Sequence, residues 1–169
     1  PYCDNQGNVV AYKKRQVDDK KFSISGNWRD GKMFGQHLFS AGQKILTICE
    51  GEFDAMSAWQ MLGGVSTYPV ISVRNGAGSA LNDCKNNFEY IDSFDTIVVC
   101  FDMDPQGREA SQQVAELFGS KVKIFKNNGS IKDASEYLQH SRGEAFVKEW
   151  WNSERFVPDG IVDGSTLWD

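Results

Sequence analysis

Apolar runs of strand length alternate with helical patterns along most of the chain. From residue 44 onward, strand-like runs cover 45–49, 70–73, 97–101 and 122–125, and helical patterns cover 54–62, 107–118 and 145–151. In the pattern 107–118, most apolar residues fall on one helical face and leave the glutamates and glutamines to water. Such alternation predicts an α/β fold with a mostly parallel sheet flanked by helices.

The first part of the chain has a different pattern. Residues 9–12 and 22–25 are short strand-like runs beside turn-forming residues, which predicts a small antiparallel β segment before the α/β core. We therefore expect a basic β-rich segment over 1–43, an α/β core over 44–140, and a C-terminal helix with a linker over 141–169. Because the chain begins with Pro1 rather than Met, we expect it to be a fragment of a longer protein.

The composition of the 169 residues is that of a globular domain, with 40% hydrophobic and 24% charged side chains. No apolar run approaches the roughly 20 residues that a membrane-spanning helix needs, and no charged n-region with an apolar stretch opens the chain. Membrane insertion and secretion are therefore not expected.

The formal net charge of −5 is unevenly distributed. Residues 1–45 carry eight basic and four acidic side chains, a balance of +4, whereas the remaining residues carry ten basic and nineteen acidic ones, a balance of −9. A basic segment beside an acidic one suits an anionic polymer on one side and cations on the other. Charge alone gives equal weight to a simpler reading, in which the basic residues are the solvated face of a hairpin.

Cysteine usage indicates buried thiols in a reducing compartment rather than a metal site. The four cysteines form no C-x-x-C pair, and neither histidine has a cysteine partner at ligand spacing. Two of them, Cys49 and Cys100, lie inside apolar strand-like runs, where a thiol behaves as a small hydrophobe. We expect no zinc site in this chain.

Carboxylates follow two of the predicted strands directly. The run 45–49 leads into Glu50-Gly51-Glu52-Phe53-Asp54, and the run 97–101 leads into Asp102-Met103-Asp104. Ligands of open parallel sheets bind at the carboxyl ends of the strands, where such side chains come together. Asp102 and Asp104 are two residues apart and can share one cation, for which hard oxygen ligands favour Mg²⁺ or Mn²⁺.

Each acidic residue also has a purely structural explanation. Asp54 by itself is better explained as a helix N-cap than as a ligand, and Glu52 fits a ligand or an outward-facing helix start equally well. Gly51 and Gly107 suit tight turns from strand into helix, and a further acidic loop surrounds Asp133. The combination of these clusters carries the prediction, because crowded carboxylates repel one another unless a cation joins them.

At these residues the chain resembles a known family. The segments 50–54 and 102–104 are similar to the two signature motifs of the Toprim domain, and the similarity is greater to the primase half of the primase-helicases of T7-like bacteriophages. It extends in colinear order from about residue 20 to 160. Further matching segments are 33–38, 70–77, 101–104 and 132–134.

The resemblance implies a role for each acidic residue. Glu50 matches the family's acid or base residue, which assists deprotonation of an attacking 3′-hydroxyl or holds a metal that does so. Asp102 and Asp104 match Mg²⁺ ligands, and Asp54 and Asp133 match further acidic positions of the same site. The implied chemistry is nucleotidyl transfer, assisted by cations that activate the nucleophile and neutralise the leaving pyrophosphate.

Basic side chains are expected to bind the triphosphate or the DNA. The candidates are Lys13, Lys14, Arg15, Lys20, Lys21 and Arg74. Arg74 departs from the family pattern, because we expect a small or polar side chain at its position.

The resemblance thus implies a DNA primase that makes RNA primers on single-stranded DNA from ribonucleoside triphosphates, with Mg²⁺ or Mn²⁺ as cofactor. Family members act in the cytoplasm of the infected bacterium and carry zinc-binding and helicase domains on the same polypeptide. This chain has no G-x-x-x-x-G-K-[ST] phosphate loop. The alternatives are a Toprim nuclease or topoisomerase fragment that cleaves phosphodiesters, and a non-catalytic DNA-binding module beside a helicase.

Overall fold

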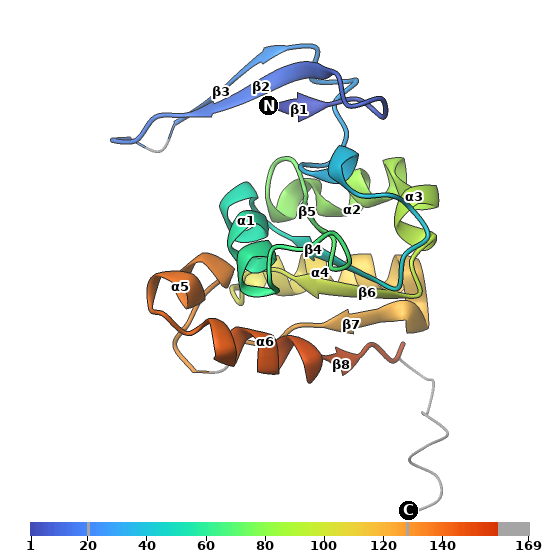
Figure 1. The fold of residues 1–169 in the computed structure, drawn as a ribbon, viewed down its shortest axis with the longest axis vertical. Helices are drawn as coiled ribbons and strands as arrows, with labels where there is room; N and C mark the ends of the chain where they lie inside the picture. Colours follow the sequence, from blue (N-terminus) through green and yellow to red (C-terminus); the bar gives the residue numbers. More distant parts are fainter. Residues whose placement is uncertain (20, 128, 159–169) are drawn as a thin grey trace, which may run out of the picture.

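The computed structural model describes residues 1–19, 21–127 and 129–158, and contains two sheets (Figure 1). Lys20 and residues 159–169 of the predicted linker lie outside the described residues. The smaller sheet is antiparallel, with β1 (Tyr2–Cys3), β2 (Val9–Arg15) and β3 (Phe22–Gly26) in that order. The antiparallel β segment predicted from the sequence is thereby confirmed, with β1 as an additional strand.

The larger sheet has the strand order β5-β4-β6-β7-β8. Its strands are β4 (Ile45–Cys49), β5 (Val70–Ser72), β6 (Thr96–Cys100), β7 (Val122–Ile124) and β8 (Glu154–Arg155). The pairs β5–β4, β4–β6 and β6–β7 are parallel, and β8 is antiparallel to β7. The predicted mostly parallel sheet is confirmed, and the two-residue strand β8 completes it at one edge.

Helices connect these strands. They are α1 (Glu52–Met61), α2 (Ala77–Asn86), α3 (Phe88–Asp92), α4 (Pro105–Phe118), α5 (Ala134–Gln139) and α6 (Gly143–Trp151), with the 3₁₀ turns η1 (Gln36–Leu38) and η2 (Gly119–Lys121). The sequence predicted α1, α4 and α6 to within about two residues, but not α2, α3 or α5. Among the described residues, no helix combines the length and the apolarity that crossing a membrane requires.

Side-chain alternation along the strands explains why helices cover both faces of the larger sheet. Leu46 and Ile48 of β4 pack into the cluster with α2, α3 and α4, whereas Cys49 packs into the cluster with α1, α5 and α6. On the second face, the indole of Trp150 donates a hydrogen bond to Thr47 Oγ1 (3.0 Å). The continuous apolar runs in the sequence therefore reflect burial on both sides.

All four cysteines are buried free thiols, as the sequence predicted. Cys49 and Cys100 are partners in the register of β4 and β6. Burial raises the pKa of the Cys84 thiol to about 12. At neutral pH this thiol is therefore protonated and behaves as a small apolar side chain.

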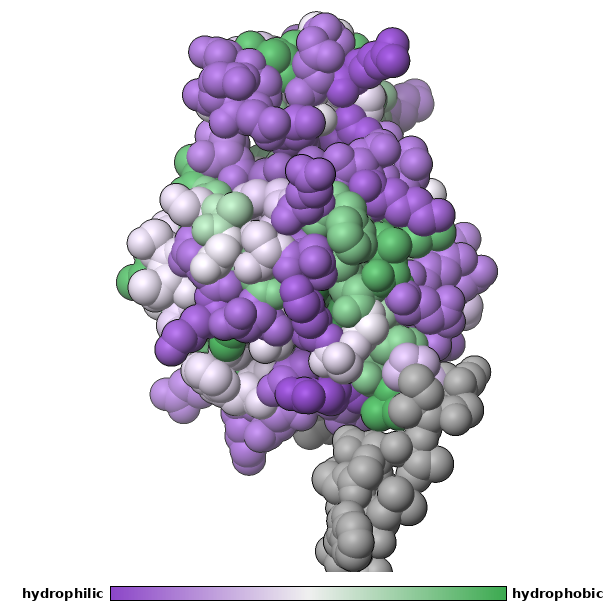
Figure 2. Space-filling model, turned by 90° about the vertical axis from the view of Figure 1, so that its right-hand side faces the viewer, coloured by the Kyte–Doolittle hydropathy of each residue, from purple (hydrophilic) through white to green (hydrophobic). Residues whose placement is uncertain are grey.

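Figures 1 and 2 show the smaller sheet above the larger body, and polar contacts attach the two. The Arg74 guanidinium, in the loop after β5, donates to the backbone oxygens of Trp28 (3.0 Å) and Gly31 (3.2 Å) beyond β3. The Tyr2 hydroxyl of β1 donates to Glu52 Oε1 of α1 (2.6 Å). These contacts place the basic strand β2 opposite the carboxyl edge of the larger sheet.

Candidate active site

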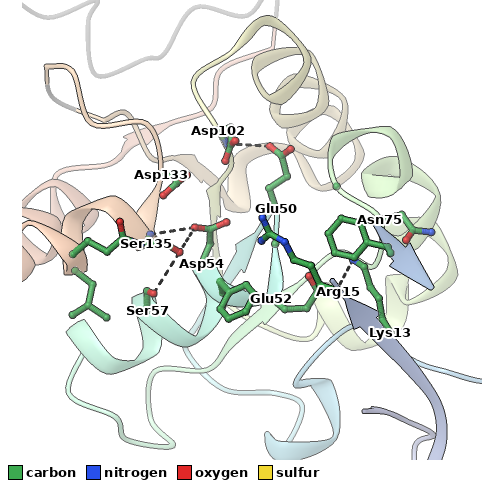
Figure 3. A pocket seen from close by; sticks show the side chains of 16 residues that line it. Lys13, Arg15, Glu50, Glu52, Asp54, Ser57, Asn75, Asp102, Asp133 and Ser135 are labelled. Atoms are coloured by element: carbon green, nitrogen blue, oxygen red, sulfur yellow. Dashed lines mark hydrogen bonds and ion pairs between the residues drawn. The ribbon is translucent and has the colours of Figure 1, made fainter. Parts of the chain in front are cut away.

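Glu50 and Asp102 lie side by side because the strands that precede them are neighbours. Cys49 of β4 and Cys100 of β6 are in register, so the residues that follow emerge together at the carboxyl edge. Glu50 Oε2 accepts a hydrogen bond from the Asp102 backbone N–H (3.0 Å), and its Oε1 accepts one from the Ala77 N–H at the start of α2 (3.3 Å). Glu50 is thus held between two loops of the site (Figure 3).

A pocket of about 820 Å³ opens between this edge and the smaller sheet. Its volume is within the range of about 300–1,000 Å³ typical of ligand sites. Its acidic lining residues are Glu50, Glu52, Asp54, Asp102 and Asp133, and its basic ones are Lys13 and Arg15. The pocket therefore has an acidic wall and a basic wall, and the side chains of both are visible in Figure 3.

Three carboxyl groups of the acidic wall, those of Glu50, Asp54 and Asp102, have raised pKa values. Burial, and then the negative charge of Asp102, raises the pKa of Glu50. Burial also raises the pKa of Asp102, against the opposing effect of Lys132. The pKa of Asp54 rises to about 6, mainly through burial and partly through the charge of Asp133, although hydrogen bonds from Ser135 oppose the rise. A cation in the pocket would relieve this repulsion.

Lys132 already supplies one positive charge. Its ammonium group lies 3.0 Å from Asp102 Oδ2, while about half of its side chain remains exposed. No role was predicted for Lys132, although it precedes Asp133 in the loop after β7. That loop ends at the same edge of the sheet as Asp102, which is the signal that could have identified the lysine.

Asp104 lies apart from the pocket lining. Its carboxylate caps α4 by accepting a hydrogen bond from the Gly107 N–H (2.8 Å), and its side chain is exposed at the start of the helix. Asp104 follows Asp102 closely, but the two carboxylates make different contacts. Sharing of one cation between them stays a prediction.

Asp54 and Asp133 both line the pocket, and each makes a structural hydrogen bond. The N-cap assignment of Asp54 is wrong, because Gly51 is the N-cap residue of α1. Asp54 Oδ1 instead accepts hydrogen bonds from the Ser135 N–H (3.1 Å) and hydroxyl (2.7 Å), which joins α1 to α5. Asp133 is the residue that caps α5, through the Glu136 N–H (2.9 Å).

Glu52 makes contacts that neither of its predicted roles included. It accepts hydrogen bonds from the Tyr2 hydroxyl (2.6 Å) and from Lys13 Nζ (2.7 Å), both on the smaller sheet. Lys13 also donates to the backbone oxygen of Arg74 (2.7 Å). Glu52 therefore connects the basic strand to α1.

Two glycines lie close to the carboxylates, and Gly107 is required for space. A Cβ at Gly107 would clash with the Asp102 carbonyl oxygen and lie 3.0 Å from Glu50 Oε2, and one at Gly51 would lie 3.0 Å from Asp54 Oδ2. Gly51 has an ordinary extended backbone, with φ −132°. The predicted tight turn at Gly51 thus needs no left-handed backbone; any larger residue would press on the carboxylates.

The basic candidates differ in where they lie. Lys13 and Arg15 line the pocket. By strand alternation, Lys14 points to the opposite face of β2. Lys21 is exposed and pairs with Asp19 (2.8 Å). The Arg74 guanidinium is largely buried and engaged within the protein, and Lys20 lies outside the described residues.

The acidic wall suits Mg²⁺ or Mn²⁺ better than zinc. Within the described residues, no three His, Cys, Asp or Glu side chains form a ready-made metal cage. Mg²⁺ is commonly bound by one or two carboxylates together with waters and substrate phosphates, and so does not need such a cage. The Lys132 ammonium on Asp102 shows that this carboxylate attracts a cation. The carboxylate oxygens present therefore fit Mg²⁺, with Asp102 and Glu50 as the central pair.

The chain is similar to known phage proteins. It is 36% identical over 169 residues to the DNA helicase/primase of Enterobacteria phage T3. The matched region covers 99% of this chain and 29% of that protein. The primase fragment of the bacteriophage T7 primase-helicase has 33% identity and a TM-score of 0.77, over 88% of this chain and 59% of that one.

A second T7 structure contains primase domains of two gp4 subunits, bound to an RNA/DNA hybrid and dTTP, with the lagging-strand DNA polymerase. A chain of that structure has a TM-score of 0.82 and 33% identity, over 92% of this chain and 76% of the other. The Toprim-like family matches residues 47–138, which is more than half of the chain. The chain therefore belongs to the Toprim-like family, and its Toprim domain resembles the primase domain of the T7 and T3 helicase/primases.

Proposed function

We propose that this chain forms the catalytic core of a DNA primase, which joins ribonucleoside triphosphates on a single-stranded DNA template with Mg²⁺ or Mn²⁺. The observation that carries the proposal is the two-walled pocket, in which Glu50 and Asp102 face Lys13 and Arg15. Nucleotidyl transfer needs both walls, because a triphosphate must be held while its leaving pyrophosphate is neutralised. The T7 structure in which primase domains are bound to an RNA/DNA hybrid supports the choice of RNA as product and DNA as template.

Glu50 is the proposed proton acceptor for the attacking 3′-hydroxyl. The pKa of Glu50 is raised toward neutral pH, and a general base accepts a proton more effectively when its pKa is near the working pH. Asp102 would hold the divalent cation, with Asp54, Asp133 and Asp104 as further acidic positions. A bound cation would neutralise charge on the phosphates, and Arg15 would hold the phosphates from the opposite wall.

The chain spans 29% of the T3 helicase/primase, so the activity of a whole protein is part of the proposal. We propose that zinc-binding and helicase domains belong to the same polypeptide, which would act in the cytoplasm of a phage-infected bacterium. Residues 1–43 would provide the basic wall and residues 44–140 the acidic wall. Residues 141–169 would lead toward the helicase domain.

The test is synthesis of labelled oligoribonucleotides on single-stranded DNA with Mg²⁺, by the chain alone and by the chain joined to zinc-binding and helicase domains. Glu50→Gln should lower synthesis by about 10²–10⁴-fold, the usual contribution of a general base. Template binding should persist, because it depends on the cationic wall. Template cleavage in place of synthesis would identify a nuclease, and near wild-type synthesis by Glu50→Gln would remove Glu50 from the mechanism.

A further inference from the structure

An exposed aromatic ring lies in the basic wall of the pocket. Phe22, the first residue of β3, is 55% exposed and lines the pocket together with Lys13 and Arg15. It pairs with Arg15 in the register of β2 and β3, so the two side chains share one face of the sheet. An exposed phenylalanine is ordinary by itself, and its surroundings decide whether it has a role.

Two cations surround this ring. Lys13 Nζ lies 4.9 Å from the ring centroid, and the Arg15 guanidinium carbon lies 5.7 Å from it. Both distances are within the range of cation–π attraction. The contacts orient the ring and the cations relative to one another, and Lys13 is itself fixed by Glu52 and the Arg74 backbone oxygen. The ring is therefore held in place while much of it faces the pocket.

An anchored aromatic ring beside fixed cations matches the two parts of a nucleotide. Phosphates bind to cationic side chains, and a base stacks on an aromatic face. Neither a purely anionic ligand nor a purely apolar one would use both features. Resting on the proposed function, we propose that Phe22 is a stacking platform for a nucleobase, whose phosphates are bound by the cations beside it.

The base could belong to a ribonucleoside triphosphate or to the single-stranded template, since both present the same chemistry. Titrations with ATP and with a single-stranded oligodeoxynucleotide separate the two sources. Inorganic tripolyphosphate and an abasic oligodeoxynucleotide are the matched probes without a base. Stacking predicts that Phe22→Ala weakens binding of the base-containing probe by roughly ten-fold and leaves its base-free counterpart nearly unchanged.

Tyr12→Ala is the matched control variant. Tyr12 is a similarly exposed aromatic residue of β2 (50% exposed), and strand alternation places it on the opposite face of the same sheet. Its loss should change neither binding constant. Phe22→Trp should restore binding and Phe22→Leu should not, because leucine keeps apolar bulk but cannot stack. Thermal melting of each variant establishes that it is folded.

The outcomes distinguish this inference from the proposed function. If the wild-type chain bound neither ATP nor the oligodeoxynucleotide, the proposed function itself would be wrong. If the wild type bound them and Phe22→Ala bound them equally well, only the stacking platform would be excluded. Equal losses for ATP and tripolyphosphate would also overturn it, because Phe22 would then serve only to position the cations.

Discussion

Several carboxyl groups of the pocket are harder to ionise in the folded protein than in the unfolded chain, so their negative charge at neutral pH lowers the stability of the fold. Asp54 shows this most clearly, because its pKa is raised to about 6 from an ordinary value of 3.8. The folded state therefore holds this proton more tightly than the unfolded chain does. Stability contributed by Asp54 is fully present below about pH 4 and is lost as the pH rises through about 6.

Asp54→Asn should remove this pH-dependent loss. The Asn Oδ1 atom can still accept both hydrogen bonds from Ser135, so the link between α1 and α5 is kept. We expect the variant to be more stable than the wild type at pH 7.5 by about 1 kcal/mol, after allowing for partial exposure, and equally stable at pH 4. Urea unfolding of both proteins at the two pH values measures the difference, and a gain of the same size at both would contradict the assignment.

Lys132 competes for the carboxylate that would hold the cation. Because its ammonium lies 3.0 Å from Asp102 Oδ2, Lys132→Gln should strengthen Mn²⁺ binding. Loss of one partly screened positive charge predicts roughly a five-fold gain in affinity. The gain is measurable by electron paramagnetic resonance of free Mn²⁺. Lys148→Gln on α6 makes the same charge change at an exposed position away from the pocket lining and should leave the affinity unaltered.

At the scale of elements, the side chains of strand β2 alternate between the two faces of the smaller sheet, so its basic residues lie on different faces. Arg15 lines the pocket, whereas Lys14 lies on the other face. Arg15→Ala should therefore weaken binding of a single-stranded oligonucleotide, and should lower the slope of log K against log [salt] by about 0.7 if one phosphate contact is lost. Lys14→Ala should retain the wild-type slope. Equal slopes for all three proteins would mean that β2 presents only a solvated face.

The strength of the sequence pattern determined which elements could be predicted. Strands β4 and β6 and helix α4 have long apolar patterns, and all three were predicted. Helix α2 buries only Ala80, Asp83 and Cys84, whose pattern gives little indication of a helix. Strands β1 and β8 have two residues each and are defined by their partners, β2 and β7. Such short elements depend on tertiary contacts that no local pattern records.

The same distinction applies to the candidate site. Glu50 and Asp102 could be placed together from the sequence, because parallel neighbours bring their carboxyl ends to one edge. The contacts of Glu52 with Tyr2 and Lys13 could not, since they join the larger body to a separate sheet whose placement no strand pairing fixes. The sequence could not decide between capping and metal binding for Asp104, because a capping aspartate and a metal ligand at a helix start look alike in sequence.

At the scale of the whole molecule, the shape of the pocket depends on the contacts that hold its two walls together. Arg74 contributes to this, because its guanidinium joins the Trp28 and Gly31 backbone oxygens of the smaller unit to Asp83 of α2. Asp83 is only 1% exposed and also accepts hydrogen bonds from the Arg74 N–H and the Ser79 hydroxyl. Arg74, at a position where we expected a small or polar side chain, thus has a buried partner in this chain.

Removal of one member of this pair should be costly, and removal of both should cost less. Arg74→Met leaves the Asp83 carboxylate buried without its cation, which typically destabilises a protein by about 3 kcal/mol or more. Adding Asp83→Asn removes the stranded charge and should recover a large part of that loss. Chemical unfolding of the wild type, both single variants and the double variant gives the coupling energy.

The same four proteins distinguish a structural Arg74 from one that binds nucleotide. If Arg74 holds the walls together, Arg74→Met should increase proteolytic cleavage between β3 and β4. The affinity of the acidic wall for Mn²⁺ should then stay near the wild-type value. If Arg74→Met instead kept wild-type stability and protease resistance but lost affinity for ATP, the guanidinium would act on the ligand. The pair with Asp83 would then be replaceable, and orientation of the basic wall would rest on the contacts of Glu52 with Tyr2 and Lys13.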